Sequence, residues 1–253
     1  MTATSAIVSH RGGALLWPEN SLLAIGDSIR LGIEQVQIDI HLSRDGKIVV
    51  MHDGTLDRTA EGSGRIEDHD WSGLSRIPLK QSGGQRIPSL EDAIGVIRDS
   101  AIVLRIEIKR DANGNPYAGL PASLGACLRA GGMAGRTILT SFSSDAVLAA
   151  AAHAPGTRLG LLANAAMLKG SGLAELIRTA GAHRMESLGL KWDALSPATV
   201  AEIGAGGLKV GAFACNDEIA IDRALSLGVD EIMTDRPDVA LHRAFNFPSR
   251  CST

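Results

Sequence analysis

The stretch Val36-Gln-Ile-Asp-Ile-His41 alternates apolar and polar residues, and this period of two is typical of a β-strand. The segment Ile102–Lys109 repeats the alternation farther along the chain. In each segment the aliphatic side chains share one face and the polar side chains share the other, which carries Gln37, Asp39 and His41 in the first segment and Arg105, Glu107 and Lys109 in the second. Both strands therefore need surroundings that accept charged side chains on one face.

Short apolar runs alternate with amphipathic stretches along the rest of the chain. The further predicted strands are Ala6–Ser9, Ile48–His52, Thr137–Ser141, Arg158–Leu162, Glu186–Lys191, Lys209–Ala214 and Glu231–Thr234. The predicted helices are Ser21–Leu31, Leu90–Arg98, Leu120–Ala130, Ser144–Ala152, Leu173–Ala180, Pro197–Ala205, Glu218–Leu227 and Pro237–Phe245. Repeated strand–helix units predict a parallel sheet covered by helices. Only Ile48–His52 breaks the order, because it follows the Arg44-Asp45-Gly46 turn closely and so either forms a hairpin or extends the preceding strand.

The length of 253 residues is close to the ~250 residues typical of a (β/α)8 barrel. In such a barrel the outer strand faces pack on helices, so the polar residues must point inward, where charges are costly unless paired or bound to a metal. An antiparallel sheet with one solvated face would also alternate. The helices between nearly all strands favour the barrel. We therefore expect an α/β fold, a (β/α)8 TIM barrel, with residues 1–253 as a single domain and the Gly-rich segment 54–86 as a small insertion after the second strand region.

Composition excludes several classes of protein. With 25 Lys and Arg against 28 Asp and Glu, the net charge of −3 gives no general reason to expect a nucleic-acid partner. No stretch approaches the ~20 apolar residues of a membrane span, and the N-terminus does not resemble a signal peptide. The three cysteines are far apart and match no metal or disulfide pattern: Cys127, Cys215 and Cys251. We expect a cytoplasmic protein, and the sequence leaves its oligomeric state open.

Asp39 and Glu107 lie near the C-terminal ends of two strands that are expected to be neighbours, so both should reach the barrel mouth. Carboxylate oxygens there suit a hard divalent cation, Mg²⁺ or Ca²⁺. The sequence has no cluster of histidine and cysteine that would indicate a dedicated zinc site.

His10 and His52 each end a predicted strand. A single histidine is more often structural than catalytic, but two beside a carboxylate pair can divide acid and base work near neutral pH. Arg11 can bind a phosphate through two N–H groups, and Lys109 can place a point charge on it. A cation, two imidazoles and two basic side chains together predict phosphoryl-transfer chemistry.

The ordered motifs of the chain resemble the glycerophosphodiester phosphodiesterase family. They are His10-Arg-Gly-Gly, Pro18-Glu-Asn-Ser21, Gln37-Ile-Asp39, Asp45-Gly46, His52-Asp-Gly-Thr-Leu-Asp-Arg-Thr59, Gly62-Ser-Gly64, Ile87-Pro-Ser-Leu90, Ile106-Glu-Ile-Lys109, Thr140-Ser-Phe-Ser143, Asn216-Asp217, Gly228-Val-Asp230 and Thr234-Asp-Arg-Pro237. Single pieces are weak, but the ordered set covers almost the whole chain and is highly specific.

The resemblance implies a (β/α)8 barrel enzyme of lipid metabolism that hydrolyses a small-molecule phosphodiester to a phosphomonoester and an alcohol, using a divalent cation. It also implies roles by motif: His10 and His52 as the acid/base pair, Arg11 as a phosphate ligand, Glu19 at a carboxylate position that contacts substrate, Gln37, Asp39 and Glu107 at the metal, and Lys109 facing the phosphate.

Two positions depart from the family pattern. Gln37 stands where the family has Glu, so the site loses one negative charge that would help to hold a cation. Phe213 stands where the family usually has Trp, and its smaller ring leaves more room at the mouth. With a polar insertion at 54–86 covering the alcohol part, and Trp71 and Leu74 anchoring that insertion, we expect a polar, sugar-sized alcohol, such as that of sugar phosphodiesters of the agrocinopine type.

Two alternatives remain open. Gln37 would also fit a degenerate barrel that binds a phosphorylated ligand without turnover. An unrelated phosphate-binding barrel such as an aldolase should show a Schiff-base lysine deep in a strand or a Gly-rich loop after the seventh strand. Lys191 is the strand lysine that suggests a Schiff base. No Gly-rich loop follows in the required place, because Gly206-Gly207 precedes a predicted strand instead of following it.

Overall fold

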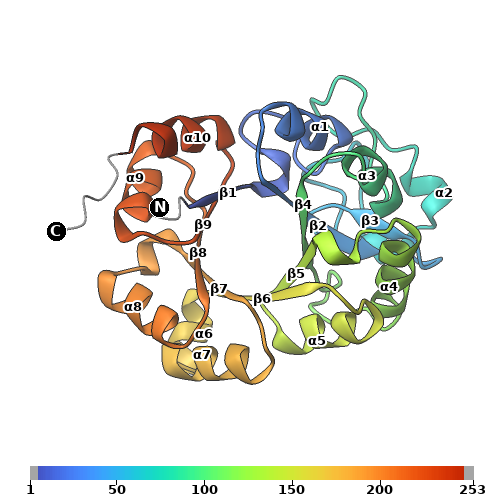
Figure 1. Cartoon of the computed structure of the whole chain (residues 1–253). Helices are drawn as coiled ribbons and strands as arrows, with labels where there is room; N and C mark the ends of the chain where they lie inside the picture. Colours follow the sequence, from blue (N-terminus) through green and yellow to red (C-terminus); the bar gives the residue numbers. More distant parts are fainter. Residues whose placement is uncertain (1–4, 248–253) are drawn as a thin grey trace.

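Eight parallel strands close into a barrel in this computed structural model, which describes residues 5–247 (Figure 1). Around the ring they are β1 (Ala6–Ser9), β2 (Gln35–Leu42), β4 (Val103–Ile108), β5 (Thr137–Ser141), β6 (Arg158–Ala163), β7 (Ser187–Lys191), β8 (Lys209–Phe213) and β9 (Glu231–Thr234). Pairing of β1 with both β2 and β9 closes the ring. The predicted fold class is confirmed.

The ninth strand, β3 (Ile48–Val50), lies outside the ring and pairs antiparallel with the C-terminal part of β2. The hairpin alternative is therefore the correct one. The strand ends two residues before the predicted His52, because the ladder stops where the Met51 N–H donates to the Asp39 carbonyl at 3.0 Å. From His52 onward the backbone turns away from β2 into the segment 54–86.

Helices surround the barrel: α1 (Leu22–Arg30), α3 (Leu90–Ile97), α4 (Leu120–Ala130), α5 (Ser144–His153), α6 (Ala165–Gly170), α7 (Leu173–Ala182), α8 (Pro197–Ala205), α9 (Glu218–Leu227) and α10 (Pro237–Asn246). The short α6 was not predicted from sequence. Local signals fix several helix starts: the Ser89 hydroxyl and the Asp92 carboxylate form a reciprocal capping box at α3. In the described part of the chain, no helix has the length and apolar character needed to cross a membrane.

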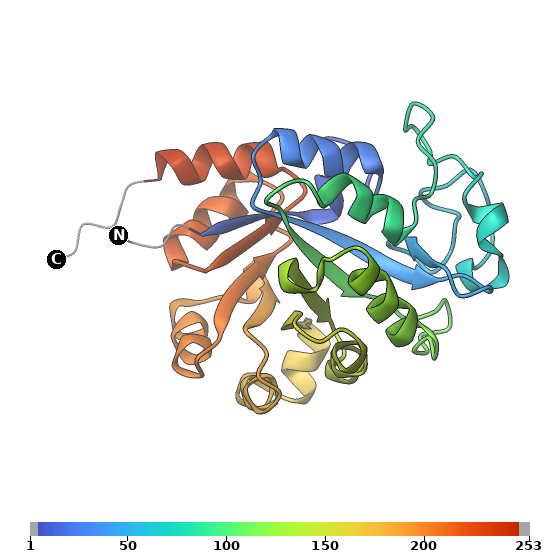
Figure 2. The same cartoon turned by 45° about the vertical axis from the view of Figure 1, so that its right-hand side comes forward.

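The segment 54–86 projects from one side of the barrel beyond β2 and β3 (Figure 2). It contains a 3₁₀ turn (Ile66–Asp68) and the four-residue helix α2 (Trp71–Leu74). A small apolar cluster, separate from the main core, joins it to the β3 region through Val49, Met51, Leu56, Ala60, Ile66, Leu74, Leu79 and Ile87, with Trp71 packed against it. Burial of Leu74 and Trp71 there holds the segment in place, as expected for anchoring residues.

The main apolar core lies between the strands and the helices. Aliphatic residues of β2 and β4, such as Val36, Ile38 and Ile106, are fully buried in it. The opposite strand faces fill the barrel interior with polar side chains, among them Gln37, Asp39, Arg105, Glu107 and Glu231, all at most 5% exposed. The alternation read from the sequence thus separates a dry outer layer from a charged interior.

Candidate active site

Two carboxylates sit side by side near the C-terminal ends of β2 and β4. Asp39 is directly opposite Glu107 in the parallel ladder. The Lys109 ammonium lies between them, 2.5 Å from Glu107 Oε1 and 3.1 Å from Asp39 Oδ1. Lys109, which was predicted to face a phosphate, therefore neutralises part of this carboxylate pair in the structure.

The carboxylate pair is short of positive charge. Burial, and then the charge of Asp39, raise the pKa of Glu107 above its usual value, while Lys109 counteracts them. Burial also acts to raise the pKa of Asp39, but surrounding positive charges, Lys109 first, lower it overall. For Lys109, burial opposes the charged form, yet the two carboxylates raise its pKa. One ammonium thus bridges two buried carboxyl groups. Asp39 has the Arg11 guanidinium 3.6 Å away as a further cation, whereas an additional positive charge at Glu107 would stabilise its ionised form.

The Gln37 side chain is fully buried, and its amide forms a hydrogen bond at each end. Its Oε1 accepts the Arg11 backbone N–H at 2.9 Å, and its Nε2 donates to Asp39 Oδ1 at 2.9 Å. Because a backbone N–H can only donate, this contact fixes which end of the amide is oxygen. A glutamate here would instead place a second carboxylate oxygen against Asp39.

His10 follows β1 directly and is oriented by a residue 225 positions away. Its Nδ1 lies 2.6 Å from Oδ1 of Asp235, which follows β9. Asn216 donates to the other Asp235 oxygen at 2.6 Å and accepts the Asp235 N–H through its own side-chain oxygen at 2.9 Å. The pairing of β1 with β9 brings these groups together.

His52 is oriented in the same manner, after β3, which lies on the same side of β2 as β1. Its Nδ1 lies 2.6 Å from Oδ1 of the adjacent Asp53. Arg58 Nε in turn donates to Asp53 Oδ2 at 2.6 Å and its two Nη groups bind Glu19 at 2.8 Å each. Burial lowers the pKa of His52, and the nearby Asp39 and Asp53 only partly offset that effect. In both histidines the carboxylate contact uses Nδ1, so Nε2 is the nitrogen that can reach a substrate.

Arg11 connects the two histidine groups. Its Nη1 lies 3.1 Å from Glu19 Oε1, and its Nε lies 3.6 Å from Asp39 Oδ2. Its backbone is in the left-handed region, with φ of 52°. Such a conformation is uncommon for a residue with a side chain and clusters at functional sites. Arg11, Glu19, Arg58 and Asp53 thus form a continuous chain of ion pairs that begins beside His10 in the sequence and ends at His52.

Asn20 is a site residue for which the sequence predicted no role. Its φ is 57°, its Nδ2 donates to Asp39 Oδ2 at 2.9 Å, and its Oδ1 accepts the Asp39 N–H at 3.1 Å. The other residues missed in this way are Asp53, Arg58, Asn216 and Asp235. All five lie within the family motifs. Asn20 and Asp53 could have been singled out because they follow the predicted site residues Glu19 and His52, whereas Arg58, Asn216 and Asp235 have no such neighbour.

Phe213 is not brought into contact with the charged cluster. It ends β8, across the ring from β4, and its ring meets Phe142 edge-on with centroids 5.9 Å apart. Its predicted place beside the substrate stays a prediction.

The residues assigned to a cation are chemically suitable for one. Among residues 5–247 no group of three or more His, Cys, Asp or Glu side chains surrounds a possible metal position. The predicted set contains only two carboxylates, because its third member is the Gln37 amide. Asp39 and Glu107 nevertheless offer carboxylate oxygens at one place, which suits a hard cation, whereas Gln37 turns its amide nitrogen toward Asp39 and its oxygen toward the Arg11 N–H.

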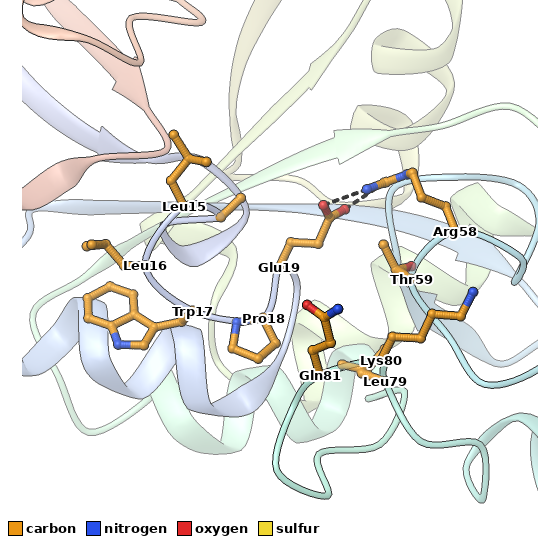
Figure 3. A pocket seen from close by; sticks show the side chains of 11 residues that line it. Leu15, Leu16, Trp17, Pro18, Glu19, Arg58, Thr59, Leu79, Lys80 and Gln81 are labelled. Carbon is orange, nitrogen blue, oxygen red and sulfur yellow. Dashed lines mark hydrogen bonds and ion pairs between the residues drawn. The ribbon is translucent and has the colours of Figure 1, made fainter.

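A cavity of about 420 Å³ opens beside this cluster. The loop after β1 forms one wall and the segment 54–86 forms the other. Figure 3 shows Glu19 joined to Arg58 across it, with Lys80 and Gln81 on the side of the segment. The lining residues are Ala14, Leu15, Leu16, Trp17, Pro18, Glu19, Arg58, Thr59, Leu79, Lys80 and Gln81.

Comparison with known proteins finds the same family over nearly the whole chain. Residues 10–239 match the model of the glycerophosphoryl diester phosphodiesterase family. A glycerophosphodiester phosphodiesterase of Caldanaerobacter subterraneus is 26% identical over 243 residues, which cover 93% of this chain and 96% of that protein.

Two solved structures show the same fold. A protein of Agrobacterium tumefaciens assigned as a glycerophosphoryl diester phosphodiesterase is 30% identical, with a TM-score of 0.91 over 96% of this chain and 98% of that one. An Oleispira antarctica phosphodiesterase in complex with the product sn-glycerol-3-phosphate is 26% identical, with a TM-score of 0.81 over 96% and 97% of the two chains.

Proposed function

This chain belongs to the glycerophosphoryl diester phosphodiesterase family, and from that premise we propose that it hydrolyses a glycerophosphodiester by histidine acid/base catalysis aided by a divalent cation. The enzyme class, a phosphoric diester hydrolase, follows from the family and its relatives. One observation carries the mechanism: two imidazoles, each oriented through Nδ1 by a carboxylate, follow the strands β1 and β3, which both pair with the strand that holds Asp39.

His52 is the base and His10 the acid in this proposal. Burial lowers the pKa of His52, which favours the neutral ring that a base requires. Its Nε2 takes the proton of the attacking hydroxyl as the oxygen bonds to phosphorus. Water gives the phosphomonoester directly, whereas a hydroxyl of the substrate gives a cyclic phosphate that water then opens in a second step. His10, paired with Asp235, gives its Nε2 proton to the leaving alcohol as the P–O bond breaks. Asp53 and Asp235 stabilise the imidazolium form of their respective partners.

Positive side chains bind the phosphate oxygens. Arg11 lies next to His10 and can bind two oxygens through its planar guanidinium. Lys109 can place a further positive charge beside these oxygens once its carboxylate partners are neutralised. Both would stabilise the charge that develops on the phosphorus oxygens in the transition state.

Asp39 and Glu107 would hold the cation, either Mg²⁺ or Ca²⁺, and the Gln37 carbonyl oxygen would join them if its amide turned away from the Arg11 N–H. Bound there, the ion would supply a Lewis acid that polarises the phosphate. The buried pair of carboxyl groups bridged by the Lys109 ammonium supports this assignment. Measuring bound metal after dialysis, and turnover of bis-p-nitrophenyl phosphate with and without chelator, tests it. Absence of any turnover under all metal conditions would favour the non-catalytic alternative instead.

The cavity beside the cluster is the proposed site for the alcohol. It shares Glu19 and Arg58 with the ion-pair chain, and Thr59, Lys80 and Gln81 add polar groups. Gln81 has a left-handed backbone, with φ of 53°, which is uncommon without glycine. A lining of this polarity suits a hydroxyl-rich alcohol, including a sugar of the agrocinopine type, better than an acyl chain.

Hydrolysis of a panel of glycerol- and sugar-phosphodiesters, with the products identified, tests this substrate assignment. Replacing 54–86 by a short linker should raise KM or change the substrate ranking more than it changes metal binding. An unchanged ranking in a folded variant would show that the segment does not read the alcohol. Location in the cytoplasm, a role in lipid metabolism and the absence of a nucleic-acid partner stay predictions from the sequence.

A further inference from the structure

His41 is the fourth inward residue of β2, after Gln35, Gln37 and Asp39, and none of the proposed chemistry uses it. Its side chain is buried, with 1% of its surface exposed, and both ring nitrogens are held. Nδ1 lies 2.9 Å from the Tyr117 hydroxyl, and Nε2 lies 3.0 Å from the backbone carbonyl oxygen of His52. The Tyr117 ring also meets the imidazole edge-on, at a centroid distance of 5.8 Å.

The partners of His41 define how its protons are placed. A carbonyl oxygen can only accept, so Nε2 carries a hydrogen and donates it to His52. In the neutral ring Nδ1 then accepts from the Tyr117 hydroxyl. Burial raises the pKa of Tyr117, which keeps that hydroxyl protonated and able to donate. The Glu67 carboxylate is a second acceptor near this hydroxyl, so each hydrogen bond of His41 has one direction when Tyr117 donates to Nδ1, and together they then fix the plane of the His41 ring.

The two proposed catalytic histidines differ in how their backbones are supported. His10 follows β1, which pairs with β2 on one side and β9 on the other. His52 follows β3, which lies outside the ring, pairs with β2 as its strand partner and has a single bridge from Val49 to Ser89 on its other side. The backbone ladder with β2 ends at the Met51 N–H, one residue before His52. One residue farther on, the His52 carbonyl is held by the His41 side chain instead of by a strand.

We propose that His41 is a positioning residue for His52: its Nε2–H, oriented by Tyr117, extends the β2–β3 pairing by one contact and fixes the backbone that carries the catalytic imidazole. The inference rests on the proposed role of His52 in proton transfer. A proton-transfer group must lie within hydrogen-bond reach of its target, and a misplacement of about 1 Å can cost on the order of 10²-fold in rate. His41 is thereby assigned a role in positioning His52 and not in proton transfer.

Amide replacements test this role, because they differ in reach. The Gln side chain places its amide nitrogen near the position of Nε2, whereas the shorter Asn places its nitrogen near Nδ1. His41→Gln should therefore keep the contact with His52, and His41→Asn and His41→Leu should lose it. Tyr117→Phe removes only the hydroxyl that orients the ring, and His183→Asn at an exposed position is the matched control.

Steady-state kinetics on one glycerophosphodiester and thermal unfolding are measured for all five variants. His41→Leu and His41→Asn should lower kcat by about 10- to 100-fold with little change in KM. His41→Gln should recover most of kcat, and Tyr117→Phe should show a smaller loss. Nitrogen NMR of the His52 ring should report an altered environment in the Asn and Leu variants and a near-native one in the Gln variant.

Equal kcat for the Gln and Asn variants would overturn the proposal, as would a change confined to KM. If the Leu variant does not fold, the Gln–Asn pair and Tyr117→Phe still decide. His52→Ala separates this inference from the proposed function. Full activity of His52→Ala would remove His52 from proton transfer, whereas an inactive His52→Ala beside fully active His41 variants would reject only the positioning role.

Discussion

Strand β4 contributes to two charged layers inside the barrel, and the buried charges are neutralised differently in the two. The floor, nearer the N-terminal ends of the strands, contains Gln35, Arg105 and Glu231, and the mouth, at their C-terminal ends, contains Asp39, Glu107 and Lys109. At the floor Arg105 Nη2 lies 2.5 Å from Glu231 Oε1, and Gln35 Oε1 accepts from the same guanidinium at 3.2 Å. One positive charge meets one negative charge, and all three residues are at most 8% exposed. Two residues farther along β4, Glu107 shares one ammonium with Asp39.

The two layers differ in their role: the floor contributes to stability and the mouth to function. A closed one-to-one pair satisfies its own charges and has no need of a ligand. The mouth layer combines an under-neutralised carboxylate pair with two oriented histidines and an ion-pair chain that reaches a cavity. Groups arranged in that way can be completed by a cation and a phosphate. Substitutions at the floor should therefore affect folding, and substitutions at the mouth should affect turnover.

The largest effect is expected at the mouth. His10→Ala and His52→Ala should each lower kcat by ~10²–10⁴-fold, because each removes a proton-transfer group. Their melting temperatures should stay close to that of the unchanged protein. Kinetics with thermal unfolding checks both statements, and near-full activity of either variant would remove that histidine from the mechanism.

At the floor the opposite result is expected. Arg105→Met leaves the Glu231 carboxylate buried and unpaired, and should lower the free energy of unfolding by about 3–5 kcal/mol. Combining it with Glu231→Leu should restore much of that loss, because the double variant contains no unpaired charge. Urea denaturation measures both. A single variant as stable as the unchanged protein would show that the floor pair does not need both partners.

Gln37→Glu changes the mouth toward more negative charge. The amide N–H that donates to Asp39 is replaced by a carboxylate oxygen, and a cation between the two carboxylates is then favoured. The cation Kd should fall by about tenfold or more, since a unit charge within about 4 Å is worth on the order of 1–4 kcal/mol. Calorimetric titration with Mg²⁺ and Ca²⁺ measures it. Unchanged or weaker affinity would place Gln37 away from the ion.

The smallest effect concerns pH. A base must be unprotonated, and burial lowers the pKa of His52 below its usual 6.5. The acid limb of kcat/KM should therefore lie below pH 6.5. Asp53→Asn removes a contact that raises this pKa, so the limb should move to still lower pH. A pH–rate profile on both proteins checks the direction, and a limb that moves upward would contradict it.

The sequence predicted the regular elements well because their signals are local. Side chains on a strand alternate between faces whatever the strand pairs with, so the alternation alone assigned Gln37, Asp39 and Glu107 to the interior. The capping box at Ser89 and the turn before β3 are likewise fixed by neighbours in sequence. The short α6 was not predicted. The end of β3 was predicted two residues too late, because it depends on a contact between Met51 and Asp39, which are distant in sequence.

By itself, then, the sequence determined which residues face the interior and, through its ordered motifs, the family. Only the tertiary structure decided which charges meet. His10 finds Asp235 across 225 residues, and Arg105 finds Glu231 across 126, because ring closure places β9 beside β1. Lys109 was expected at a phosphate and lies between two carboxylates. Periodicity gives the side of a strand on which a side chain lies, but its partner is set by strands that are distant in sequence and adjacent in space.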